Sequence, residues 1–180
     1  LTRKEVGLPE EGFVFCCFNN TYKFTPQVFD SWARILKSVK DSVLIIYANN
    51  DLSKTNLNKE IENRGVKAER LILGKSIPKP EYLARYRTAD LFLDTHPYNA
   101  GTTASDALKM GLPMITYLGK SYQARMGASI ISALNLPELI TNSPEEYEAL
   151  AIELATNPEK LKAIKDKLKS NLSSAPLFDT

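Results

Sequence analysis

Cysteine and histidine, two common ligands of metal and redox sites, are scarce in this sequence. The 180 residues include two cysteines and one histidine, His96. Cys16 and Cys17 are adjacent in an apolar run, so in a strand their side chains point to opposite faces and cannot readily pair. His96 has no cysteine or second histidine near it in sequence. We therefore expect reduced cysteines, no metal and no other cofactor.

Long apolar runs and an excess of charge of one sign are absent as well. The 23 basic and 21 acidic residues give a formal net charge of +2. The apolar runs are of strand length, and residues 1–12 lack the apolar region of a signal peptide. We expect a cytoplasmic protein with no membrane and no nucleic-acid partner, in which any anion binding is local.

Strand-like runs alternate with helix-like segments along a chain that is 43% hydrophobic and 24% charged. This composition indicates one well-cored globular domain over residues 1–180. The expected strands lie at residues 12–18, 42–48, 70–73, 91–94, 113–117 and 138–140. Amphipathic or capped segments predict helices that begin near residues 26, 52, 81, 102, 120, 144 and 158.

This alternation predicts parallel βαβ units, and therefore an α/β, Rossmann-like three-layer sandwich with a mostly parallel sheet. In such sheets ligands bind outside the carboxyl ends of the strands, where the strand order reverses. The loops expected at that edge are residues 19–23, 49–51, 74–80, 96–103 and 118–122. None contains GxGxxG or GxxxxGK[ST], which argues against a standard dinucleotide fingerprint or a P-loop.

The stretch from residue 91 to residue 113 reads as a strand, a polar loop and the start of a helix at Thr102 and Thr103. The first backbone N–H groups of a helix are unpaired and carry partial positive charge, so they can hold a phosphate. Asp106, one turn further on, is close enough to reach a ribose hydroxyl. Equally, Thr102 or Thr103 is the N-cap of an ordinary helix, and Asp106 complements its positive end.

Four cations lie in or near the loops of the same edge, and a diphosphate requires one or two of them. They are Lys23, Lys79, Arg85 and Arg125. For any one lysine, exposure to solvent is the ordinary alternative. Tyr82 places a ring near the third strand, either to cover a flat heterocycle or to pack partly in the core.

Several motifs together resemble the C-terminal catalytic half of the O-GlcNAc transferase (SPINDLY-type) glycosyltransferases. They are FCCFNNTYKFTP, SIPKPEYLARY, ADLFLDTHPYNAGTTASDALKMGLPMIT, SYQARMGASII and SSAPLFDT, and they span nearly the whole chain. The resemblance implies the nucleotide-sugar half of a GT-B enzyme, in which two Rossmann-like domains enclose the active site. It implies UDP-sugar as donor, a Ser/Thr protein acceptor, an N-terminal half outside this sequence, and tetratricopeptide repeats further upstream.

The resemblance also implies roles for individual residues. Lys23 matches the lysine on the sugar-nucleotide diphosphate and is the candidate catalytic residue, with Asn20 at a position that is usually glutamine. Thr102 and Thr103 match the phosphate-binding threonines, and Asp106 matches the ribose-binding aspartate. The nucleoside would be contacted by a separate segment, which contains Ile77, Lys79, Tyr82 and Arg85.

One departure concerns Gly101. The family commonly reads GHTT, whereas this chain reads Ala100-Gly101-Thr102-Thr103, so the phosphate-contacting histidine is missing and His96 is not its obvious replacement. Two alternatives to a donor-binding domain therefore stand. One is a non-catalytic interaction module that has lost nucleotide binding. The other is a sugar-nucleotide epimerase, which requires a second set of acid/base residues that the sequence does not reveal.

Overall fold

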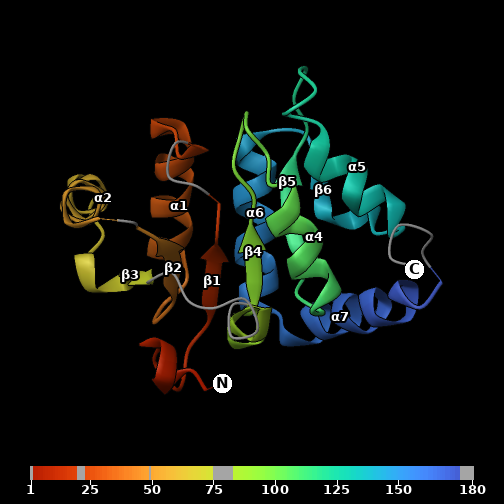
Figure 1. Cartoon of the computed structure of the whole chain (residues 1–180), viewed down its shortest axis with the longest axis horizontal. Coiled ribbons are helices and arrows are strands. Elements are labelled where there is room, and N and C mark those ends of the chain that lie inside the picture. The colour runs from red at the N-terminus through yellow and green to blue at the C-terminus, as the bar shows by residue number, and fades with distance from the viewer. Residues whose placement is uncertain (1, 20–22, 49, 75–82, 175–180) are drawn as a thin grey trace.

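The structure, a computed structural model, describes residues 2–19, 23–48, 50–74 and 83–174. Its centre is a parallel six-stranded sheet in the order β3-β2-β1-β4-β5-β6 (Figure 1). The strands are β1 (Val14–Cys17), β2 (Val43–Tyr47), β3 (Leu71–Gly74), β4 (Leu91–Leu93), β5 (Met114–Tyr117) and β6 (Ile140–Thr141). Every residue of β1, β4 and β5 is buried, so both faces of the sheet are covered. The predicted α/β sandwich with a parallel sheet is confirmed.

Six α-helices are described beside the sheet (Figure 1). They are α1 (Pro26–Ser38), α2 (Asp51–Asn63), α4 (Thr102–Lys109), α5 (Met126–Ala133), α6 (Pro144–Thr156) and α7 (Pro158–Leu172). Helix α1 packs against both α2 and α6, whereas α4 and α5 pack against each other and against β5. Residues 83–85 are helical and lead into the 3-10 turn η4 (Tyr86–Thr88).

The local signals that start the helices act as predicted. Thr25 caps α1 by accepting a hydrogen bond from the Val28 amide, and Pro26 occupies the first helical position, where its missing N–H costs nothing. Ser143 and Asn157 cap α6 and α7 in the same way. The apolar stripe of α1 is buried, with Trp32 fully enclosed. One face of that helix therefore contributes to the core, as its periodicity predicts.

Some element boundaries differ from the sequence prediction. The helix expected over residues 120–134 begins only at Met126, because residues 119–125 form a turn closed by a 2.8 Å hydrogen bond from the Gly119 amide to the Ala124 carbonyl. Strand β6 is shifted to Ile140–Thr141, since Pro137–Leu139 forms a 3-10 turn. The N-cap of α4 is Gly101, so neither threonine caps this helix.

Cys16 and Cys17 are free and buried, as predicted for reduced strand residues. Within the described parts of the chain, no three His, Cys, Asp or Glu side chains gather closely enough to hold a metal ion. Nor does any described helix have the length and apolarity needed to cross a membrane.

Candidate functional site

The start of α4 lies at the reversal point of the sheet. Strands β1 and β4 are neighbours, and the strand order runs outward from them in both directions. The loops that follow β1 and β4 therefore meet at the carboxyl edge, which is where parallel sheets bind ligands. Thr102 and Thr103 are the first two residues of α4, so their amides belong to the unpaired N–H groups of its first turn.

A pocket of about 540 Å³ opens at this point. Four predicted site residues line it, namely Lys23, Gly101, Thr102 and Thr103. The other walls come from the end of β1, from the loop before α4 and from the start of α5, and consist of Phe18, Asn19, Tyr98, Asn99, Gln123 and Met126. The fold thus brings a lysine from the first crossover to the helix start that follows the fourth strand.

Hydrogen bonds position the two sides of this pocket. Lys23 Nζ donates to the Asn99 carbonyl at 3.2 Å. Thr103 Oγ1 donates to Asn19 Oδ1 at 2.5 Å, and Asn19 Nδ2 donates to Thr95 Oγ1 at 2.7 Å. The buried Asn19 amide therefore joins the end of β1 to both ends of the β4–α4 loop. Sequence reasoning assigned Asn19 no role, because an asparagine after a strand signals only a break.

Asp94 organises the loop between β4 and α4. Its Oδ1 accepts the backbone N–H groups of Thr95 and Ala100, both at 2.8 Å, and its Oδ2 accepts the Thr116 hydroxyl at 2.8 Å. The carboxyl is fully buried, and this burial raises its pKa to about 7. The sequence marks Asp94 only as an acidic strand end, so this role was missed.

Asn99 ties the same loop to α5. Its Nδ2 donates to the Thr95 carbonyl at 2.7 Å, and its Oδ1 accepts the Gly127 amide at 3.0 Å. Gly127 is placed where no side chain fits, since a Cβ there would lie 2.4 Å from Asp94 Oδ2. The start of α5, which carries Met126 into the pocket wall, is therefore fixed by the β4–α4 loop.

Two buried hydrogen bonds link the residue that follows β4 to helices α6 and α1. Tyr147 of α6 donates its hydroxyl to the Asp94 carbonyl at 2.9 Å, and Trp32 Nε1 of α1 donates to that hydroxyl at 3.1 Å. All three residues are buried. The start of the β4–α4 loop is thus bonded to closely packed core residues, which limits how far the loop backbone can move.

Replacing Asp94 by asparagine is expected to change how stability depends on pH. Because the folded-state pKa of Asp94 is raised to about 7, the folded chain holds a proton that the unfolded chain releases above about pH 4. The stability from Asp94 is therefore complete below about pH 4 and falls by about 1 kcal/mol per pH unit until about pH 7. Asparagine can accept the same two amides and donate to Thr116 without titrating.

The measurement is urea unfolding of both proteins from about pH 5 to pH 7.5. The free energy of unfolding of the wild type, relative to that of Asp94→Asn, should decline as pH rises across this range. Parallel pH profiles of the two proteins would contradict the prediction.

The remaining predicted residues divide into three groups. Asp106 lies one turn along α4 and does not line the 540 Å³ pocket. Arg85 is also outside this lining, and it is only 2% exposed. Its guanidinium lies over the ring of Tyr47 at 4.1 Å and faces that of Phe18 at 5.3 Å. The last group, which lies outside the described residues, consists of Asn20, Ile77, Lys79 and Tyr82.

His96 and Arg125 also lie near this edge but outside the pocket lining. The His96 ring stacks on Tyr117 with 3.9 Å between ring centroids, and its carbonyl accepts the Thr25 hydroxyl. Burial lowers the pKa of His96, which favours the neutral ring at pH 7. Arg125 lines a neighbouring pocket between α4 and α5. Neither side chain therefore takes the place of the histidine that the family resemblance implies at position 101.

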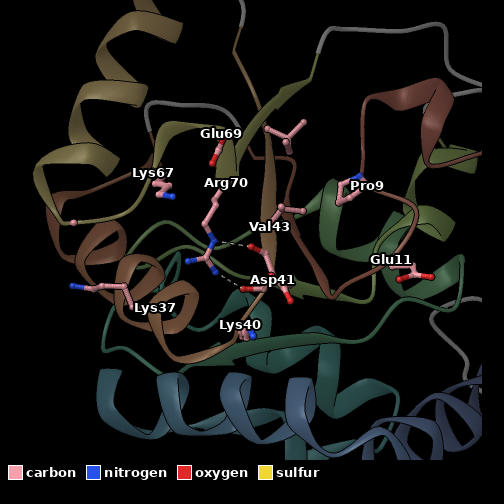
Figure 2. A pocket seen from close by; sticks show the side chains of 12 residues that line it. Pro9, Glu11, Lys37, Lys40, Asp41, Val43, Lys67, Glu69 and Arg70 are labelled. Carbon is pink, nitrogen blue, oxygen red and sulfur yellow. Dashed lines mark hydrogen bonds between the residues drawn. The ribbon is translucent and has the colours of Figure 1, made fainter.

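A larger pocket, of about 780 Å³, lies at the opposite edge of the sheet, where β2 and β3 begin (Figure 2). Arg70 lies at its centre, but its guanidinium donates to the carbonyls of Leu36, Val39 and Ser42. That side chain satisfies the carbonyls at the end of α1 and the turn after it. The pocket is thus built around a structural cap and lacks the reversal-point geometry.

The architecture defines a Rossmann-like α/β domain with a pocket at the point where the strand order reverses. An O-GlcNAc transferase mutant from Thermobaculum terrenum superposes with a TM-score of 0.88 at 34% identity, over 91% of this chain and 32% of that one. The UDP-GlcNAc 2-epimerase from Neisseria meningitidis, bound to UDP-GlcNAc, superposes with a TM-score of 0.61 at 11% identity, over 95% of this chain and 45% of that one. The second likeness shows the fold alone.

The family model of glycosyl transferase family 41 matches residues 1–180, and the chain belongs to this family. It is 33% identical over 178 residues to the UDP-N-acetylglucosamine–peptide N-acetylglucosaminyltransferase of Caenorhabditis elegans. That match covers 99% of this chain but only 16% of the relative. The resemblance inferred from the motifs is therefore confirmed.

Proposed function

We propose that this chain is the donor-binding domain of an inverting protein O-glycosyltransferase. The enzyme would transfer GlcNAc or another hexose from a UDP-sugar to serine or threonine. Family membership and the name of the C. elegans relative support this proposal. The observation that carries it is the pocket that Lys23 shares with Thr102 and Thr103 at the N-terminus of α4.

The chemistry assigned to this domain is stabilisation of the leaving group. When the bond between sugar and phosphate breaks, negative charge develops on the β-phosphate of UDP. The first N–H groups of α4, including that of Thr103, and the Thr102 hydroxyl would donate to it, and the Lys23 ammonium would face it. The Thr103 hydroxyl itself donates to Asn19 Oδ1. These groups are positioned before the reaction, so little reorganisation is needed. The proposal needs no metal and no other cofactor.

The nucleoside is assigned to the residues beyond the phosphate pocket. Asp106 would bind the ribose, since it lies one turn along α4 from the threonines. The family resemblance assigns the base to Ile77, Lys79 and Tyr82, and assigns Asn20 to the donor beside Lys23. The resemblance assigns Arg85 to the same group, and its guanidinium is held on aromatic rings at the ends of β1 and β2.

A general base and an acceptor site are expected on another part of the full-length enzyme. The chain spans about 16% of the C. elegans relative and 32% of the Thermobaculum transferase chain, so much of each lies outside it. We therefore assign a second catalytic half to the complete protein. The family resemblance further assigns tetratricopeptide repeats upstream of it. The chain alone should transfer little or no sugar. Its two buried thiols fit a reducing cytoplasm.

A second candidate function is a non-catalytic interaction module with the same fold. The observation that favours it is Gly101, which stands where the family commonly has a phosphate-contacting histidine. A glycine removes one donor but leaves the α4 amides and both threonines in place. The two functions differ in one property that can be measured on this chain, which is binding of UDP.

Isothermal titration of the chain with UDP tests the proposal. We expect UDP to bind with a Kd of about 1 mM or tighter, and ADP to bind more weakly because the base segment is assigned to uracil. Amide chemical shifts of Gly101, Thr102 and Thr103 should move during the UDP titration. If UDP at concentrations several-fold above about 1 mM gives neither a heat of binding nor chemical-shift changes, the interaction module replaces the donor domain as the assigned function.

A further inference from the structure

Two pockets meet at the start of α4 and share one wall. The phosphate pocket contains Lys23 and Thr103, and the second pocket, of about 590 Å³, extends between α4 and α5. Both are lined by Gly101, Thr102 and Met126, which we call the shared wall. The shared wall is thus the boundary between a phosphate site and an adjacent open space.

The contact between Gly101 and Met126 closes this boundary. A Cβ at position 101 would lie 3.1 Å from Met126 Sδ, so the sulfur packs directly against the glycine backbone. Met126 is the first residue of α5, and the bond from the Gly127 amide to Asn99 Oδ1 fixes that helix start. The side chain is unbranched and only partly buried, so it can be shortened without opening the core.

The orientation of the bound UDP-sugar determines which part of it would contact the shared wall. With the diphosphate at Thr102 and Thr103, the ribose is assigned to Asp106, which lies outside the phosphate pocket. The rest of that pocket, including Tyr98, Gln123 and Met126, is then left for the sugar. A substituent on the sugar ring would therefore press against Met126, with the second pocket directly behind it.

We propose that Met126 is a specificity-determining residue, whose side chain limits the size of the acyl substituent on the donor sugar. This inference rests on the proposed function, because it requires a UDP-sugar in the phosphate pocket. Shortening Met126 would join the two pockets, and a longer acyl group could then extend between α4 and α5. An extra methylene weakens binding by about tenfold or more where the pocket wall leaves no room for it.

The test is isothermal titration of the chain with UDP, UDP-GlcNAc and the N-butanoyl analogue of UDP-GlcNAc. For the wild type, the Kd of the analogue should be at least about tenfold higher than that of UDP-GlcNAc. In Met126→Ala this difference should shrink to about twofold or less, with the Kd of UDP little changed, because the wall is removed but the phosphate groups remain.

Two further variants separate wall removal from general loosening of α5. Met126→Leu keeps the volume and should keep the wild-type discrimination. Ile130→Ala shortens a side chain one turn along the same helix, in the second pocket only, and should also keep it. UDP binding with equal discrimination in wild type and Met126→Ala would overturn the assignment of Met126 alone. Absence of UDP binding to the wild type would overturn the proposed function and this inference together.

Discussion

Replacing Lys23 by alanine is expected to weaken UDP binding to this chain by roughly 10- to 100-fold, the range for loss of a hydrogen bond between charged partners. Lys23 Nζ reaches the Asn99 carbonyl at 3.2 Å and lines the same pocket as Thr102 and Thr103. A diphosphate bound at the start of α4 would therefore lose its nearest described ammonium partner. The measurement is isothermal titration with UDP at low ionic strength, where the charge is least screened.

Lys109→Ala is the matched control for this experiment. Lys109 is an exposed residue in the last turn of α4, so the substitution removes one positive charge at the end of α4 that lies away from the phosphate pocket. It should leave the Kd of UDP within about twofold, since a surface charge this far along the helix is screened by solvent. Equal effects of the two substitutions would mean that Lys23 acts only through net charge, and would contradict its assignment to the diphosphate.

Replacing Gly127 by alanine is expected to destabilise the fold by about 1–3 kcal/mol, which corresponds to a fall in Tm of about 2–10 °C for a chain of this size. The new Cβ would lie 2.4 Å from Asp94 Oδ2 and 2.9 Å from Thr116 Oγ1. Both oxygens belong to the buried network that holds the β4–α4 loop, so neither can move without breaking a hydrogen bond. The measurement is thermal and urea unfolding followed by circular dichroism.

Gly101→Ala provides the comparison for Gly127→Ala. It is the same chemical change at the same sheet edge, but its Cβ would meet only the flexible end of Met126, at 3.1 Å. We expect a loss of less than about 1 kcal/mol, because an unbranched side chain can shift by a few tenths of an ångström. Should both variants unfold at the same temperature, the rigidity assigned to the Asp94 network would be wrong.

Much of the fold was predictable because its signals are local. Apolar runs such as residues 42–48 predicted buried strands, and Thr25 with Pro26 predicted the start of α1. The errors occurred where local patterns were ambiguous. Residues 120–125 read as the first turns of α5 but form a turn, because the Gly119 amide pairs with the Ala124 carbonyl.

The candidate site was predictable only in part. The motifs identified Lys23, Thr102 and Thr103, and the fold brings all three to one pocket. Their roles in donor binding stay predictions, as do those of Asp106 and Arg85. Asn19, Asp94 and Asn99 were missed, because buried polar residues that build a loop resemble ordinary turn residues when only their neighbours in sequence are known.

The sequence by itself determined the succession of strands and helices along the chain, the starts of the capped helices α1, α6 and α7, and the family. Those features depend on patterns of a few residues, or on motifs that recur in relatives. Only the tertiary structure decided that Lys23 lies against Asn99, 76 positions away, and that Met126 borders two pockets. Such contacts follow from the placement of β1 beside β4, because neighbouring parallel strands bring the loops at their carboxyl ends together.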